Sequence, residues 1–506
     1  MRKGKTTIRR GAAVVAMALG TLAIAGSGAG AAGANLPDIL NGQSDAQALR
    51  LKVTVPGTAE IQAVLKEAGL DTSAVDLSGL GLDGLTIDQK ISLTHGEVLR
   101  SLEDGATDVA SGWASVLQGL LGGDMPTAQT RCTGADCSDA IATDATRIDL
   151  PLGLGHVILN GASSKTASLV DTRNDTALAQ VLVDPEELLA TLGVDTQLRE
   201  LTNTFNTTVI PVVNDVIETA DETIHSLPLD NTEKDIIDRI VTLDPVDPLP
   251  DLTKVDLVSL DVLGSTSNIF PETRTGVEGL LAEASSKIAN VALLGDWATI
   301  GSIDLKTEAY ANGVKGGAKA VATSNVVDAN IGDGIGVHVS GADLQFLTNP
   351  VKVYETIRKD AQLLPELEGP LTQVANASKL LLQIAGIKVE LFGTEENAAK
   401  NGLWATSRAG SLKVTIEPQL INQAGLAAIT SAPVGTVPLL DDDKHFTSTG
   451  LRVELTAPEA YSAVSVGNVQ SCCFNEPPKT GVATPLLASL MLLGGAITIR
   501  RFALAR

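Results

Sequence analysis

The sequence predicts an α+β fold in which a mainly antiparallel β-sheet body carries amphipathic helical inserts. Segments such as "ALRLKVTV" and "LRVELTAPEAYSAVSVGN" alternate apolar and polar residues, as strands with one buried face do. Others, such as "DTQLRELTNTFNTTVIPVVNDVIETADETI", place apolar residues three and four apart, which is the spacing of an amphipathic helix. With 44% apolar residues in 506, the chain can build a large core.

The chain begins with the three parts of a secretory signal peptide, over residues 1–34. Five Lys and Arg residues before position 11 are followed by an apolar run over about 12–25, and small residues up to Ala34 then offer signal-peptidase sites. The apolar run is short for a membrane span, which needs about 20 residues. We therefore expect general secretion and cleavage rather than an uncleaved N-terminal anchor.

Three regions follow, separated by their patterns. Residues 35–175 and 296–476 are predicted to be rich in β-strands, and the second of these carries a helical insert at about 350–386. Residues 176–295 are predicted to be helical, with Asp or Asn at N-cap positions. The "YANGVKGG" stretch carries an Asn-Gly hairpin signal. Strand blocks on both sides of helices fit either two α+β domains or one large sheet assembled from distant segments.

Charge and aromatic content exclude several classes of ligand. The formal net charge is −23, and without the five basic residues of 1–34 and the three of 482–506 the middle of the chain has 29 Lys and Arg against 60 Asp and Glu. Such a field repels phosphate backbones, so we expect no nucleic-acid partner. Aromatic residues are only 3%, which disfavours an aromatic-lined recognition site unless it is one small cluster.

The chain ends in an apolar run over 482–499 followed by two arginines, which alone would predict a single-pass transmembrane anchor. The run is preceded by Pro477, Pro478, Lys479, Thr480 and Gly481. Together, residues 477–506 resemble the sorting signal of Gram-positive, sortase-anchored surface proteins of the LPXTG type.

The resemblance implies that a sortase cuts between Thr480 and Gly481 and joins the Thr480 carbonyl to an amine of the peptidoglycan precursor. The rigid Pro478 bend and the small Gly481 suit an extended peptide that enters a cleft. Pro477 stands where the family pattern has Leu, so the alternative is an uncut transmembrane helix. A similarity in style to the actinobacterial choice-of-anchor families, such as choice-of-anchor G, implies no activity.

Four cysteines in an exported chain predict disulfides, with three possible connectivities. The short "CTGADC" segment favours a local bridge between Cys132 and Cys137. Cys472 and Cys473 would then form a vicinal pair, and the alternative is a crossed pairing that ties the two sites together. The five histidines are scattered and no CxxC spacing occurs, so we predict no metal site.

No motif predicts catalysis or a cofactor. Gly79, Gly81 and Gly84 match a GxGxxG pattern, but a strand-like segment follows where a dinucleotide fold needs a helix. The acidic run that begins at Asp441 could supply oxygen ligands to calcium, although a solvated loop is the simpler interpretation. His338 is interpreted as a strand residue rather than a base.

These observations predict a non-enzymatic, cell-wall-anchored surface protein with a structural or adhesive role. Its expected partners are signal peptidase, a sortase, peptidoglycan and an extracellular protein or other surface ligand. The alternatives are a surface hydrolase whose site is dispersed in the sequence, and a module that binds an apolar ligand, either of them held by an uncut C-terminal helix.

Overall fold

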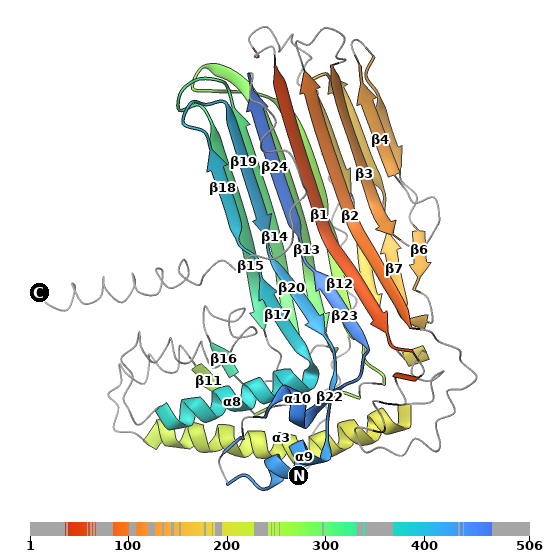
Figure 1. The fold of residues 1–506 in the computed structure, drawn as a ribbon, viewed down its shortest axis with the longest axis vertical. Helices are drawn as coiled ribbons and strands as arrows, with labels where there is room; N and C mark the ends of the chain where they lie inside the picture. The colour runs from red at the N-terminus through yellow and green to blue at the C-terminus, as the bar shows by residue number, and fades with distance from the viewer. Residues whose placement is uncertain are drawn as a thin grey trace, which may run out of the picture.

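Two ten-stranded sheets lie face to face in the computed structural model, and helices cover one end of the pair (Figure 1). The structure describes residues 36–467. The larger gaps are most of 61–83, and 101–107, 120–126, 188–194, 227–240, 331–336 and 340–367, with shorter ones elsewhere. The signal peptide predicted for 1–34 and the sorting signal predicted for 477–506 lie outside the described residues. The predicted α+β, mainly antiparallel fold is confirmed.

The front sheet, which faces the viewer in Figure 1, joins strands from both ends of the described chain. Its members are β1 Leu40–Val55, β2 Leu85–Arg100, β3 Val109–Gly119, β4 Thr127–Cys132, β17 Ile387–Leu391, β18 Thr394–Ala398, β19 Trp404–Gly410, β20 Leu412–Ile416, β23 Arg452–Thr456 and β24 Glu459–Val466. The first half of β1 pairs with β24 and the second half with β23, so the sheet forks along this strand.

The back sheet is built mainly from the middle of the chain. Its members are β5 Asp139–Ala142, β6 Thr146–Asp149, β7 Gly155–Leu159, β8 Ala162–Ser168, β9 Asp171–Thr176, β10 Ala179–Val183, β12 Val258–Arg274, β13 Val277–Leu293, β14 Ala298–Ala311 and β15 Lys319–Asn330. It forks in the same way along β12, which pairs with β10 at one end and β9 at the other. The sequence pattern fitted either two α+β domains or one large sheet assembled from distant segments. The described residues form two facing sheets that share one interior.

The chain passes from the front sheet to the back sheet between β4 and β5. Cys132, the last residue of β4, is fully buried and forms a disulfide with Cys137, two residues before β5 begins. Backbone hydrogen bonds between Thr133 and Asp136 close the same turn. The bridge therefore fixes the point where the chain changes sheets. Cys472 and Cys473 lie outside the described residues.

The prediction of a helical region over 176–295 is wrong at both ends of that range. Helix α3 Asp195–Ser226 lies within it, but strand β10 lies near its start, and β12 and β13 form a long antiparallel hairpin over 258–293. The β13 sequence "VEGLLAEASSKIANVAL" is rich in helix-forming Ala, Leu and Glu, yet its inward positions are buried between the two sheets. Tertiary burial therefore overrides the local preference. The Asn-Gly segment does lie in a hairpin loop, between β14 and β15.

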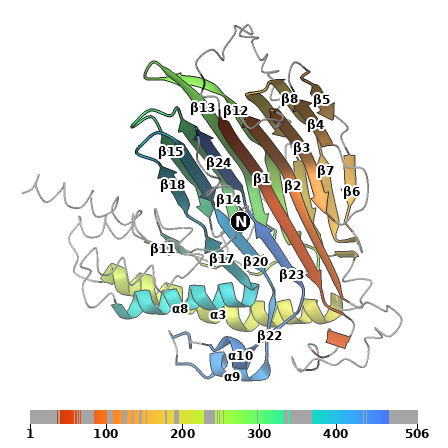
Figure 2. The same cartoon turned by 45° about the horizontal axis from the view of Figure 1, so that its top comes forward.

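Helices α3 and α8 Glu368–Ala385 pack together across one end of the sandwich (Figure 2). Asn206 and Asn214 of α3 each hold the backbone of the following Pro/Asp-rich segment. Asn206 accepts from the Leu249 amide at 2.8 Å and donates to the Leu249 carbonyl at 2.9 Å. Asn214 makes the same pair of bonds with Val246, at 2.7 and 3.2 Å. Two side chains thus replace a strand partner for this segment.

The remaining elements are short. Strand β11 Val241–Leu243 pairs with β16 Val337–Val339, and β21 Gln419–Ile421 pairs with β22 Phe446–Ser448. Helix α9 Gln423–Thr430 begins at the N-cap Asn422, and α10 Asp442–His445 follows later in the chain. Within the described residues, none of the helices is both long enough and apolar enough to span a membrane.

The interior between the sheets has a polar middle. One large apolar cluster lies toward the helices and a smaller one toward the opposite end. Between them, buried hydroxyl groups bond across the two sheets: Ser92 to Ser265 at 3.1 Å, Thr130 to Ser164 at 2.6 Å. Small side chains allow the sheets to approach closely, which accounts for a core that uses Ala, Gly, Ser and Thr and few aromatic residues.

Candidate functional site

A single row of side chains crosses seven adjacent strands on the outer face of the front sheet. The strand registers place its members opposite one another in turn, and we call them the front row: Glu395, Arg408, Tyr461, Asp45, His95, Trp113 and Gln129. The seven residues come from β18, β19, β24, β1, β2, β3 and β4 in that order, so the row joins segments up to 416 residues apart, from Asp45 to Tyr461.

The alternation of the strands fixes the outward direction of the row. Ser44, which precedes Asp45, points inward and donates to the Glu283 carbonyl of the back sheet at 2.5 Å. Ser462, which follows Tyr461, also points inward and bonds with a buried threonine of the back sheet at 2.8 Å. Successive residues face opposite sides of a strand, so the row members lie on the outer face. This face is the broad one in the foreground of Figure 1.

The centre of the row is a coupled pair, His95 and Asp45. The His95 Nδ1 atom lies 2.6 Å from Asp45 Oδ1, and Gln43 donates to the other oxygen of Asp45 at 2.7 Å. Burial alone would lower the pKa of His95, but the hydrogen bond to Asp45 and the charges of Asp45 and Glu97 outweigh it, so the pKa is raised above 6.5. The imidazolium form is therefore stabilised beside Asp45 relative to that of a free imidazole.

Aromatic side chains gather on this face although the chain is poor in them. The His95 ring stacks on Trp113, with centroids 5.7 Å apart and an interplanar angle of 29°. Tyr461 belongs to the same row, and Trp404 lies on the same face four residues before Arg408. The chain has three Trp and three Tyr. Of the four that the structure describes, three are on the outer face of the front sheet, and all three are half-buried.

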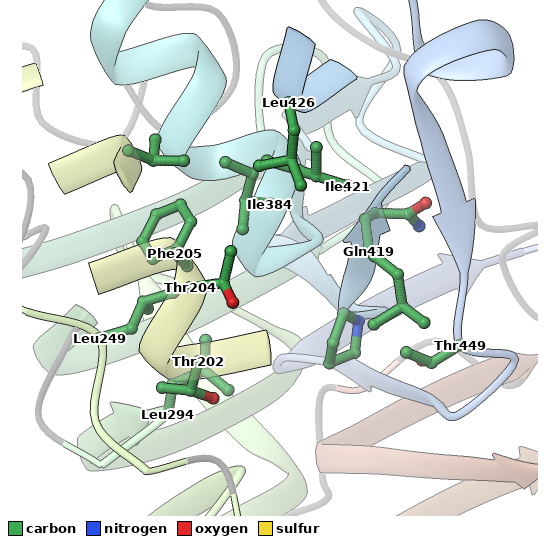
Figure 3. Close-up of a pocket in the computed structure, with 13 residues that line it drawn as sticks. Thr202, Thr204, Phe205, Leu249, Leu294, Ile384, Gln419, Ile421, Leu426 and Thr449 are labelled. Carbon is green, nitrogen blue, oxygen red and sulfur yellow. The ribbon is translucent and has the colours of Figure 1, made fainter. Parts of the chain in front are cut away.

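An apolar pocket of about 40 Å³ lies at the end of the sandwich that the helices cover (Figure 3). Phe205 of α3, Ile384 of α8 and Leu426 of α9 converge on it, with Leu249 and Leu294 completing its wall. Pockets that bind small molecules are usually several hundred Å³, roughly 300 or more. This pocket holds little more than one or two water-sized groups, so it gives scant support to an apolar-ligand module.

A second pocket, of about 160 Å³, is polar and lies on the outer face of the front sheet near its helical end. Arg50, Lys52 and Lys413 line it. Arg50 already pairs with Asp88 at 2.6 Å, and Lys413 with Glu454 at 3.4 Å. Two of its three cations are thus neutralised within the protein, and the pocket is a weaker candidate than the front row.

The residues singled out from sequence are not brought together. Gly84 lies just before β2 with a φ of +81°, while Gly79 and Gly81 lie outside the described residues. Asp441 pairs with Lys444 at 2.9 Å beside α10. His338 is a strand residue of β16, opposite Thr242 of β11. In the part of the chain that the structure describes, no three His, Cys, Asp or Glu residues are grouped as metal ligands.

Sequence reasoning missed the front row. Its members stand singly in seven strands, and only the order of the strands in the sheet brings them together. One signal was available: Asp45, His95, Trp113 and Tyr461 each hold a polar-face position in an alternating segment. That pattern alone does not say which strands are neighbours.

No family model matches the chain, and no curated protein matches it. Among solved structures, the crystal structure of the outer membrane protease OmpT from Escherichia coli aligns with 85% of this chain and 97% of its own. The identity is 6% and the TM-score 0.09. A likeness this weak says nothing about fold or activity.

Proposed function

We propose that this protein is a secreted surface protein of a Gram-positive bacterium, attached to the cell wall through Thr480, with a structural or adhesive rather than enzymatic role. The observation that supports an adhesive role best is the front row: side chains capable of binding, spread over a broad open sheet face rather than converging in a cleft. The rigid scaffold beneath suits this role, because hydrogen bonds to the back sheet hold six of the seven strands, β1, β2, β4, β18, β19 and β24.

Attachment rests on the order of signals at the two ends of the sequence. A basic and apolar start over 1–34 and the PPKTG motif before an apolar run are the signals that export and sortase anchoring require. Only Phe474, Asn475 and Glu476 separate the cysteine pair from Pro477, and no Pro/Ser/Thr-rich stalk precedes the motif. The folded body would therefore sit close to the wall.

The test of attachment is the identity of the C-terminus. Walls of cells that produce the full chain are digested with a muramidase, and the released protein is analysed by mass spectrometry. We expect termination at Thr480 joined to a peptidoglycan fragment. Thr480→Ala should abolish this product, whereas Lys479→Ala, at the variable position of the motif, should leave it intact. An unprocessed Arg506 terminus in the membrane fraction of wild-type cells would favour the uncut anchor instead.

The test of adhesion compares cells that display the wild-type chain with cells that carry a front-row variant at equal surface density. We expect the variant cells to lose attachment to the surfaces that wild-type cells colonise. A Trp113→Ala variant that adheres as well as wild type would count against the front row as the adhesive face.

A further inference from the structure

The front row combines two kinds of group that recognise sugars. Trp113, whose ring stacks on His95 on one side, and Tyr461 supply aromatic rings, and the apolar faces of pyranose rings stack on such rings. Asp45 and Gln129 supply hydrogen-bond acceptors, since each Asp45 oxygen has a second lone pair beyond the one that His95 or Gln43 uses. Arg408 supplies a guanidinium, which has five N–H donors. A polyhydroxylated ligand needs both, because each hydroxyl group both donates and accepts.

The charge of the row points to an uncharged ligand. Going from β18 to β2, acids and bases alternate at Glu395, Arg408, Asp45 and His95, with Tyr461 between the second and third. The row pairs its two acids with one Arg and one His, so it offers little net attraction to a polyanion or a polycation. The strongly acidic chain around it also repels polyanions. A neutral ligand is not opposed by this field.

The shape of the face points to a long and flat ligand. Neighbouring strands are about 4.8 Å apart, so Trp113 and Tyr461, three strand steps apart, are separated by about 14 Å across the sheet. Neither of the two pockets described above includes a front-row residue. Pyranose rings whose hydroxyl groups are all equatorial have flat apolar faces, and β-1,4 linkages keep a chain of such rings straight. A chain of this kind can lie across the strands and reach both aromatic residues.

We propose that the outer face of the front sheet binds an uncharged, linear β-1,4-linked polysaccharide through the front row. The chain lies across the strands, stacks on Trp113 and Tyr461, and exchanges hydrogen bonds with Asp45 and Arg408. This inference rests on the proposed adhesive role and names its ligand class. It does not depend on how the protein is attached to the cell.

The test measures binding of soluble hexasaccharides to the full chain in mild detergent by isothermal titration calorimetry. Cellohexaose and chitohexaose are the probes, and maltohexaose, whose α-1,4 linkages curve the chain, is the control sugar. We expect binding of at least one β-linked probe and none of maltohexaose. Trp113→Ala and Tyr461→Ala should each weaken binding about tenfold, as expected for the loss of one stacked ring.

Two further variants separate a binding role from a structural one. Trp113→Phe keeps a ring at the same position and should retain most of the affinity. Phe270→Ala removes a half-buried aromatic residue from the outer face of the back sheet and should leave affinity unchanged. Thermal unfolding of each variant shows whether it is folded. If Trp113→Ala does not fold, the affinity of Trp113→Phe still tests whether an aromatic ring at this position binds the sugar.

The proposal is overturned if neither β-linked probe binds wild type, if maltohexaose binds equally well, or if binding survives both alanine substitutions. Loss of binding in Phe270→Ala to the same extent would also overturn it. Failure of the wall-attachment test with intact sugar binding would leave this inference standing. Normal cell adhesion without any sugar binding would reject the polysaccharide ligand but leave the proposed adhesive role standing.

Discussion

The Asn174 side chain of the back sheet lies directly over Gly112 of the front sheet. A Cβ atom at position 112 would be 2.2 Å from Asn174 Oδ1 and 2.6 Å from Nδ2. Asn174 cannot swing away freely, because it accepts from the Ser164 hydroxyl at 2.6 Å and donates to the Ser267 carbonyl at 3.1 Å. The separation of the two sheets beneath the front row is therefore set by a residue without a side chain.

Substitution of Gly112 by Ala is expected to destabilise the protein by about 1–3 kcal/mol, because the added methyl group must displace Asn174 or push the sheets apart. Urea unfolding measures the loss. Gly369→Ala is the control, since nothing lies within 4 Å of the Cβ position there. In the double variant with Asn174→Ala, the two losses should be less than additive, because the clash is relieved. Strictly additive losses would contradict the proposed clash.

The pair of His95 and Asp45 should make stability depend on pH. The pKa of His95 is raised in the folded protein above 6.5, so the pair contributes fully below the unfolded pKa and the contribution is lost as the pH rises through the folded pKa. The stability difference between wild type and His95→Gln, measured by urea unfolding from about pH 5 to about pH 9, should therefore shrink as the pH rises.

Asp45→Asn provides the complementary variant for this pair. It removes the hydrogen bond to a carboxylate and the charge that raise the pKa of His95, and leaves burial, which lowers it, opposed only by Glu97. His95→Gln made in the Asp45→Asn background should therefore lose the dependence on pH seen in wild type or reverse its sign. A dependence of unchanged size in that background would mean that another group is responsible.

The Asn206 side chain should contribute more to the free energy of unfolding than its position on a surface helix suggests. Asn206→Ala leaves both the amide and the carbonyl of Leu249 without their side-chain partner, and we expect a loss of about 1–3 kcal/mol. Asn203→Ala, at an exposed position of the same helix, controls for the change in helix propensity and should alter stability by about 0.5 kcal/mol or less. Equal effects of the two substitutions would refute a special role for Asn206.

The bridge between Cys132 and Cys137 closes a short loop, so its expected contribution is modest, about 2 kcal/mol by loop entropy. The double variant Cys132→Ser, Cys137→Ser should unfold at a correspondingly lower temperature than the oxidised wild type in a calorimetric scan. Added reductant should lower the unfolding temperature of wild type much more than that of the double variant. A drop of equal size in both would assign the effect to other thiols.

Alternating segments such as "ALRLKVTV" were enough to predict a mainly antiparallel sheet fold, because every second residue of a strand with one buried face is apolar. The β13 segment was misassigned because its small and helix-forming residues suit both states, and only the facing sheets decide between them.

The front row was beyond prediction for a different reason. Asp45 and Tyr461 are neighbours only because β1 pairs with β24, and that pairing joins the two ends of the described part of the chain. Periodicity reports which face of a strand is buried but not which strand lies next to it. The sorting signal needed no such information, since its five residues are contiguous, and it stays a prediction.

The pairing of β1 with β24 also determines how the molecule would carry a pulling force. Leu40 pairs with Val466, and eight residue pairs in succession join the two strands, while β19 holds the other side of β24 over seven. A tension applied beyond Gly467 and directed along the strand would load these hydrogen bonds together, in shear, instead of opening them one after another. A tether at this end of the chain would therefore transmit load into the centre of the front sheet, next to the strands that carry Asp45 and His95.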